Sequence, residues 1–216
     1  MLRLLTFILL LLFCGDVSAQ WDFGAYVNMT RVKLKGDSPK DFSYQAGYNP
    51  NFGAIVNYYF KYDARISFQP GYALNRSVLR YRDRELDEKR DSINLNLDYI
   101  RLPLYLDIIS DNDKWHYVVG VDFQLALNQE GEAIGSGETT DLNDDLRNFN
   151  PVVIFGLGRR ISLWGGILNV DLRFGQSILN ISDVPDDETS LVPRIKTSTF
   201  ELLVAYEFNL HRKKSQ

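Results

Sequence analysis

The sequence has little cysteine and histidine, and its charge is mild. The single cysteine, Cys14, lies in an N-terminal segment that we expect to be removed, so the mature chain would have none. That excludes a disulfide, a thiolate nucleophile and a cysteine-ligated metal. A lipoprotein acylated at Cys14 is disfavoured, because bulky Phe13 precedes it where a small residue is expected. The formal net charge of −4 does not suggest a nucleic-acid partner, which would need a concentrated basic surface.

Long apolar runs are missing from residue 20 onward. No stretch there approaches the roughly 18 consecutive apolar residues that a membrane helix needs. If the chain enters a membrane, it must therefore do so as a closed β-barrel, because only closure satisfies every strand hydrogen bond in lipid.

Residues 1–19 have the three parts of a secretory signal peptide. Arg3 supplies the positive charge, Leu4–Phe13 the apolar core, and Val17-Ser18-Ala19 the small residues of a cleavage site. We expect cleavage between Ala19 and Gln20. The protein is therefore predicted to be exported.

The mature chain shows repeated alternation of apolar and polar residues, the period of a β-strand with two different faces. Eight such stretches are separated by connections that are alternately long and short. The predicted strands are Trp21–Thr30, Phe52–Phe60, Ala64–Asn75, Ser92–Ser110, Trp115–Leu127, Pro151–Leu163, Leu168–Phe174 and Ile195–Phe208.

An even strand number with alternating short turns and long loops is typical of bacterial outer-membrane barrels. We therefore predict an all-β fold, an eight-stranded antiparallel up-and-down transmembrane β-barrel over residues 20–210, with a basic C-terminal tail at residues 211–216. Both termini and the short turns would be periplasmic, and the long loops would be extracellular.

The fourth predicted strand, Ser92–Ser110, changes phase along its length. Ile93, Leu95 and Leu97 share one parity, whereas the leucines from Leu102 onward share the other. Because one extra residue swaps the faces of everything after it, we predict a β-bulge near Tyr99-Ile100-Arg101. Pro103 cannot donate to a ladder and needs an irregular or unpaired position.

The three tryptophans, Trp21, Trp115 and Trp164, all fall at strand ends on the predicted periplasmic rim. Tryptophan favours the membrane interface, where the ring is buried while its N–H stays hydrated. Core tryptophans placed at random would not gather at one end. The pattern therefore supports the predicted topology.

Alternation alone does not say which face points inward, because a soluble lipocalin-like barrel would carry its apolar face inside. In the membrane barrel the charged face lines a lumen that eight strands make about wide enough for side chains to fill. Charges there are tolerated when they are paired and hydrogen-bonded. We predict a plugged lumen. Glu207 belongs to the inward-facing set, and because it lies near the rim, the alternative is that it faces solvent. The predicted lumen network is Arg65, Asp122, Arg160, Asp171, Arg173 and Glu201.

Three segments resemble the PorT-like outer-membrane β-barrel proteins of Gram-negative bacteria. They are LDYIRLPLYLDI at Leu97–Ile108, VDLRFGQSILNISD at Val170–Asp183 and ELLVAYEF at Glu201–Phe208. The resemblance implies an eight-stranded outer-membrane barrel, and the family's namesake assists type IX protein secretion. These loose motifs mark architecture rather than an activity.

Few residues are available for catalysis. A barrel hydrolase needs a general base near a nucleophile, and the only histidines are His116 at the periplasmic rim and His211 in the tail. We interpret His116 as a hydrogen-bonded rim residue and expect no enzymatic activity. The acidic segments Asp141–Asp145 and Asp183–Glu188 lack the spacing of a calcium loop, so we expect solvated loops and neither metal nor cofactor.

The leading hypothesis is a non-enzymatic, monomeric outer-membrane barrel that serves a structural, docking or secretion-accessory role. Its partners would be outer-membrane lipid and an unidentified envelope or secretion protein that contacts the long loops. The alternatives are a soluble secreted lipocalin-like binder of a small apolar ligand and, less favoured, a barrel hydrolase.

Overall fold

The computed structural model describes residues 20–36, 42–61, 63–81, 92–134, 136–182 and 195–208. The predicted signal peptide, Ala19 at its cleavage site, and the basic tail lie outside these residues. Among the described residues, no helix is long and apolar enough to cross a membrane.

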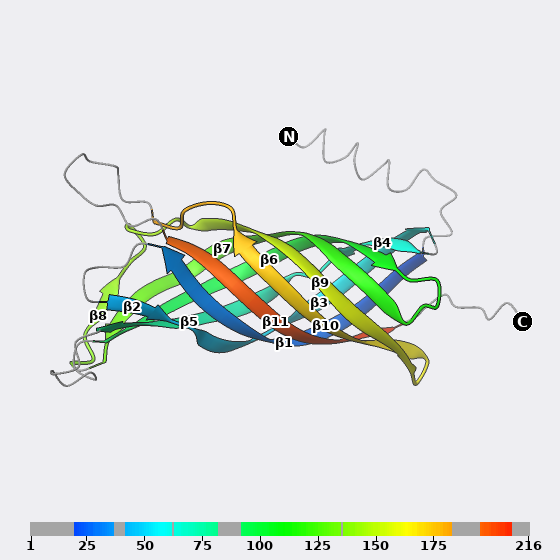
Figure 1. Ribbon diagram of the computed structural model, residues 1–216, viewed down its shortest axis with the longest axis horizontal. Coiled ribbons are helices and arrows are strands. Elements are labelled where there is room, and N and C mark those ends of the chain that lie inside the picture. The colour runs from blue at the N-terminus through cyan, green and yellow to red at the C-terminus, as the bar shows by residue number, and fades with distance from the viewer. Residues whose placement is uncertain are drawn as a thin grey trace, which may run out of the picture.

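The described strands form one antiparallel sheet that closes on itself into an elongated barrel (Figure 1). The strands are β1 (Gln20–Gly36), β2 (Phe42–Gln45), β3 (Gly47–Lys61), β4 (Ala64–Phe68), β5 (Gly71–Tyr81), β6 (Ile93–Ile109), β7 (Trp115–Ala133), β8 (Thr139–Asp141), β9 (Phe149–Leu163), β10 (Gly166–Ser177) and β11 (Ile195–Phe208).

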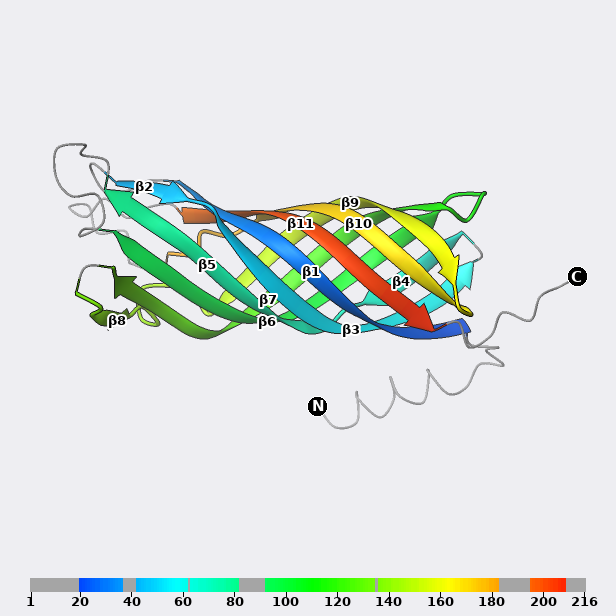
Figure 2. The same cartoon turned by 90° about the horizontal axis from the view of Figure 1, so that it is seen from below.

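A ring of eight hydrogen-bonded strand positions closes the barrel, as predicted. β4 and β5 share one position, since both pair with β3 on one side and β6 on the other. β2 pairs with β5, and β8 pairs only with β7 among the described strands. The ring closes where β1 pairs with β11 from Phe23 opposite Phe208 to Gly36 opposite Ile195, and the two strands lie side by side in Figure 2.

The break between β4 and β5 accommodates Pro103 of β6. The Gln69 N–H donates to the Pro103 carbonyl over 3.2 Å, and the Ala54 N–H donates to the Pro70 carbonyl over 2.9 Å. Because the N and C=O of one strand residue point to the same neighbour, the missing N–H of Pro103 faces the end of β4. The proline therefore occupies the irregular position that its chemistry requires.

We call the two ends of the barrel the short-turn end and the long-loop end. At the short-turn end lie the start of β1, the end of β11 and the tight connections β3–β4, β6–β7 and β9–β10 (Figure 1). Trp164 and Gly165 form the last of these with φ of 49° and 83°, a left-handed turn that glycine adopts at little cost.

The outward face carries a band of exposed apolar side chains, which we call the belt. It includes Phe23, Val27, Met29, Phe52, Ile66, Phe68, Ile100, Leu104, Leu106, Ile108, Val119, Phe123, Leu125, Phe155, Leu157, Leu172, Leu202 and Val204. The charged side chains face inward at the same level. This is the reverse of the lipocalin-like alternative, whose apolar face would be inside.

The strands continue beyond the belt at the long-loop end, and several predicted loops are therefore shorter than expected. β1 runs to Gly36 rather than ending at Thr30, β5 runs to Tyr81, and β7 runs to Ala133. Above the belt on β1, the outward residues become charged and exposed, whereas Val32 and Leu34 face inward and are buried.

The predicted bulge in β6 is wrong. The β5–β6 register runs without a break from Gly71 opposite Arg101 to Leu79 opposite Ile93, so β6 keeps one inward parity. Its apolar pattern inverts at the upper edge of the belt, where its outward residues become polar, as they do on β1. Leu97 is consequently buried on the inner side, like Val32 on β1.

The irregularity opposite that point lies in β7. Asp98 pairs with Asn128 while Tyr99 pairs with Ala126, so Leu127 is the extra residue of a bulge. Buried inward positions on β7 are even-numbered before it, as at Gln124, and odd-numbered after it, as at Gln129. The face swap that the sequence suggested for β6 occurs in its neighbour.

Candidate functional site

The candidate site is the lumen. All six residues predicted for its charge network face inward and are buried, with Arg160 the most accessible at 6% exposure. They come from different strands: Arg65 from β4, Asp122 from β7, Arg160 from β9, Asp171 and Arg173 from β10, and Glu201 from β11.

A first cluster, centred on Arg65, lies nearest the short-turn end. Its guanidinium donates from Nε to Asp107 Oδ2 over 2.7 Å and from Nη1 to Glu207 Oε2 over 2.6 Å. Nη1 also lies 2.9 Å from the Tyr59 hydroxyl. The inward position predicted for Glu207 is confirmed, and the alternative that it faces solvent is wrong, because Arg65 holds it inside the barrel, where its exposure is 0%.

A second cluster joins β7 to β10. His116 Nε2 lies 3.2 Å from Asp171 Oδ1, and Arg173 Nη2 donates to Asp171 Oδ2 over 2.7 Å. Arg173 Nη1 donates to Gln69 Oε1 over 2.8 Å, and its guanidinium stacks 4.8 Å from the Tyr105 ring centre. His116 is therefore a buried lumen residue with a carboxylate partner.

Two glycines of β9 make room for this second cluster. A Cβ at Gly158 would overlap Asp171 Oδ1 and the His116 ring, and one at Gly156 would lie 2.8 Å from Arg173 Cγ. The Gly-Leu-Gly segment is thus explained by close side-chain packing in the lumen.

A third cluster, centred on Arg101 of β6, lies closer to the long-loop end. Arg101 Nε donates to Asp122 Oδ2 over 2.6 Å, and Nη2 lies 3.0 Å from Glu201 Oε1. Gln124 also donates to Asp122 over 2.8 Å, and Asn28 donates to Glu201 over 3.2 Å. Both carboxylates therefore have a charged and a neutral donor.

Arg160 connects the first cluster to the short-turn end. Its Nη2 donates to the Tyr59 hydroxyl over 3.3 Å, and its Nη1 lies 3.3 Å from Asp113 Oδ1 in the β6–β7 turn. Asp113 is more accessible than the lumen carboxylates, so this pair is the solvent-facing end of the network.

Uncharged side chains line the lumen beyond the third cluster. Val32, Leu34, Leu97 and Tyr99 are buried there, and Gln129 donates to the Arg147 carbonyl over 3.1 Å. The lumen is therefore charged through the belt, and above it apolar side chains alternate with uncharged polar ones.

Several network members were not selected from the sequence, notably Arg101, Asp107, His116 and Gln69. Alternation would have found most of them, because each has the inward parity of its strand. Arg101 was instead assigned to the predicted bulge, while His116 was judged by its nearness to a strand end. The partners of each charge come from distant strands, which a local pattern does not reveal.

The three predicted rim tryptophans all lie at the short-turn end. Trp164 is almost fully exposed in its turn. The Trp21 ring packs 5.0 Å from that of Tyr58, and Arg159 stacks 5.4 Å from the Trp115 ring centre. Each ring thus lies where the outward surface of the barrel meets its end.

No group of three or more His, Cys, Asp or Glu side chains within the described ranges could hold a metal ion. Asp141, Asp144 and Asp145 are exposed at the long-loop end. The other acidic segment, Asp183–Glu188, lies outside the described residues.

Comparison with solved structures finds several outer-membrane proteins. Neisserial surface protein A is 10% identical, with 87% of this chain and 97% of that one covered and a TM-score of 0.47. Ail from Yersinia pestis is 13% identical, with coverage of 88% and 99% and a TM-score of 0.43. OprG from Pseudomonas aeruginosa is 10% identical, with coverage of 88% and 95% and a TM-score of 0.43.

No curated protein sequence matches the chain. The family model described as "Outer membrane protein beta-barrel domain" matches residues 17–183, which is most of the sequence. Together with a closed ring of strands that is apolar outside and charged inside, this match identifies the chain as a member of the outer membrane protein beta-barrel domain family, located in the outer membrane.

Proposed function

We propose that this outer-membrane barrel is non-enzymatic and monomeric, has a closed lumen, and serves as a structural, docking or secretion-accessory component through its long loops. The observation that carries the proposal is the filling of the lumen. Three clusters of paired charges cross its interior, and uncharged side chains fill the level above them. With its interior occupied, the barrel offers its loops as the surface for recognition.

In the proposed orientation both termini face the periplasm and the long loops face outward. The start of β1, the end of β11 and the short turns share one end, which supports this arrangement (Figure 1). Outer-membrane barrels generally have short periplasmic turns and long extracellular loops. The tryptophans at the short-turn end would mark the periplasmic interface.

The surroundings of His116 support a role without catalysis. The side chain is buried, faces Asp171, and lies against Gly158 in the lumen. A lipid or peptide in the leaflet would not reach it. We therefore assign His116 to the lumen network.

The secretion-accessory part of the proposal comes from the PorT-like motifs. These motifs contain Arg101, Asp107, Asp171, Arg173 and Glu201, which are members of the lumen clusters. The residues that carry the resemblance thus include those that fill the interior of the barrel. The surface that binds a partner would instead lie on the loops. An envelope or secretion protein remains the partner we propose.

A pull-down from detergent-solubilised envelope tests the docking role. The wild type would be compared with a variant in which the exposed acidic residues Glu138, Asp141, Asp144 and Asp145 become amides. A partner that the wild type retains and the amide variant loses supports recognition by these loops. Identical partner sets, or recovery of lipopolysaccharide alone, would count against it.

Cysteine labelling tests the orientation, since replacing Cys14 would leave no other cysteine in the chain. Ser136→Cys places an exposed thiol at the long-loop end, and Asn112→Cys places one in a short turn. A membrane-impermeant maleimide should label only the first in intact cells.

Planar-bilayer recordings test the closed lumen. They should show no steady open channel for the wild type.

A further inference from the structure

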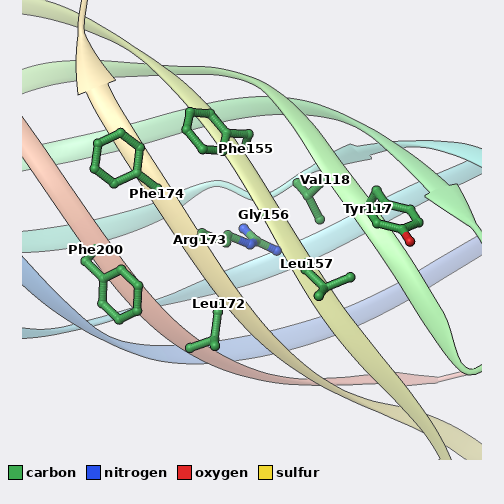
Figure 3. A pocket seen from close by; sticks show the side chains of 9 residues that line it. All are labelled: Tyr117, Val118, Phe155, Gly156, Leu157, Leu172, Arg173, Phe174 and Phe200. Atoms are coloured by element: carbon green, nitrogen blue, oxygen red, sulfur yellow. The ribbon is translucent and has the colours of Figure 1, made fainter.

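The belt contains a groove on its outer surface. It is an open groove with a volume of about 490 Å³. Six outward-facing apolar or aromatic side chains from β7, β9, β10 and β11 line it, together with Val118, Gly156 and Arg173. Figure 3 shows Phe174 and Phe200 on one side of the groove, Tyr117 and Leu157 on the other, and Phe155 and Leu172 between them. A volume of this size lies within the range of small-molecule sites, roughly 300–1,000 Å³. The groove suits a flexible apolar chain.

Exposed cations form a ladder next to the groove, above the belt. Arg31, Lys33 and Lys35 point outward from β1, and Lys196 points outward from β11. We call these four residues the basic ladder. Lys35 lies directly opposite Lys196 in the strand register. Like charges in that position are destabilising, so their placement is explained best by an anion that binds between them.

Cross-strand neighbours of the ladder do not neutralise it. Within the described register, Arg31 lies opposite Phe200 on β11 and Tyr48 on β3, and Lys33 lies opposite Ser198. None of these partners is a carboxylate. Among the residues that the structure describes, the four positive charges thus have no carboxylate opposite them in the strand register.

The groove and the ladder adjoin through one residue pair. Phe200 is a wall of the groove and is also the cross-strand partner of Arg31, and such partners have Cβ atoms about 4.5–5.5 Å apart. Along β1 the ladder continues from Arg31 toward the long-loop end, and β1 and β11 stay adjacent over this length (Figure 2). The apolar groove therefore adjoins the basic ladder directly. An amphiphile with an apolar chain and an anionic headgroup needs these two surfaces side by side.

We propose that this surface binds one lipid of the leaflet at the long-loop end, a lipid that carries more than one phosphate. An acyl chain lies in the groove beside Phe155 and Phe200, and the phosphates lie on the basic ladder. Charge-assisted contacts to phosphate are the strong hydrogen bonds of such sites. Four clustered cations favour a lipid with several phosphates over one with a single phosphate. The proposal does not require a protein partner on the loops. It also holds whether the leaflet at the long-loop end is the outer or the inner one.

The opposite side of the barrel has the opposite charge. After the β7 bulge, Glu130 and Glu132 occupy the outward parity, and Glu138 and Asp141 are exposed beyond them. An anionic headgroup would be repelled there. The headgroup is therefore confined to the β1 and β11 side.

Lipid retention in native mass spectrometry, with the full barrel refolded in a neutral detergent, tests the proposal. The probes are lipid A with two phosphates, phosphatidylglycerol with one, and phosphatidylcholine as a zwitterionic reference. The R31Q/K33Q/K35Q variant removes three ladder charges from exposed positions. K61Q/R80Q/K114Q removes three equally exposed cations elsewhere and serves as the matched control.

Wild type and control are expected to bind lipid A with affinities within about twofold of each other, since the control changes charge alone. The ladder variant loses three charge-assisted contacts and should therefore bind lipid A at least tenfold more weakly. L172W, which fills the groove, should weaken binding while leaving the ladder intact. Heat-modifiable gel mobility checks that each variant is folded.

Equal binding of lipid A by the ladder variant and the control would overturn the basic ladder as the headgroup site. Phosphatidylglycerol binding as tightly as lipid A would overturn the preference for several phosphates. If L172W binds like the wild type, the acyl chain does not occupy the groove.

Discussion

β1 has two parts that share one backbone register but differ in which face is apolar. Up to Met29 its outward residues are apolar, and the inward ones include Asn28 and Thr30. Beyond that point Arg31, Lys33 and Lys35 face outward, while the inward residues are aliphatic. The first part is built for lipid and the second for water. The inversion shows that the outward face of a strand can change from apolar to charged because it passes from lipid into water, without any shift in which residues point outward.

β6 and β7 differ in how their side-chain pattern changes at the upper edge of the belt. β6 keeps its parity, so the inversion of its pattern comes from the surroundings alone. β7 inserts Leu127, and the face swap places Glu130 and Glu132 outside and Gln129 inside. If β7 kept strict alternation through Leu127 instead of forming a bulge there, Glu130 and Glu132 would point into the lumen, where an unpaired charge is costly.

The largest expected effect tests the charged level of the lumen. Arg65→Ala removes the cation that holds Asp107 and Glu207, both at most 1% exposed. Removing one partner of a buried pair costs about 3–5 kcal/mol, and here two carboxylates lose it. Urea unfolding of the refolded barrel measures the loss. Arg31→Ala, an exposed arginine above the belt, should change stability by no more than about 0.5 kcal/mol. Similar losses of stability for Arg65→Ala and Arg31→Ala would contradict the proposed difference between buried lumen charges and exposed charges above the belt.

A smaller effect is expected for a charge placed on the belt. Val27→Lys puts an ammonium group on the lipid-facing side of β1, which costs about 2–4 kcal/mol near the midplane. Lys33→Val makes the reverse change on the same face above the belt and should stay within about 0.5 kcal/mol, because that face is in water. Unfolding in lipid vesicles compares them. A costly Lys33→Val and a harmless Val27→Lys would place the belt at the wrong level.

Glycine replacements compare the packing of the two lumen levels. At Gly158 a new Cβ would overlap Asp171 and His116, so Gly158→Ala should destabilise the barrel by about 1–3 kcal/mol. At Gly131, above the belt, the nearest atoms would lie 3.5 Å away, an ordinary contact. Gly131→Ala should therefore change the unfolding midpoint much less. The reverse order would show that the charged level has room to relax.

The smallest expected effect concerns the basic ladder. Lys196→Glu replaces a like-charge pair with an opposite-charge pair across from Lys35, which should stabilise the lipid-free barrel by about 0.2–1 kcal/mol. The unfolding midpoint in neutral detergent at low salt measures this gain, and added salt should reduce it. A loss of stability would mean that Lys196 already has a favourable partner.

Much of the architecture could be predicted from local pattern. Strict alternation identified eight strand positions and the inward parity of residues such as Arg65 and Arg173. The alternating lengths of the connections predicted an up-and-down ring. These features depend on neighbours in the sequence, and a period-two pattern reports them directly.

Other features depend on residues that meet only when the ring closes. The pairing of Arg65 with Glu207, 142 positions apart, decides that a charge near a strand end is buried. The location of the extra residue in β7 depends on its pairing with β6, since one strand alone does not distinguish a bulge from a change of solvent.

The sequence by itself determined a closed, two-faced barrel, because each strand must present one face to lipid and the other to the lumen. Only the tertiary structure decided which charges pair, where the belt ends and where Leu127 shifts the register. Ion pairing and strand register are set by distances between strands, and closure of the ring establishes those distances.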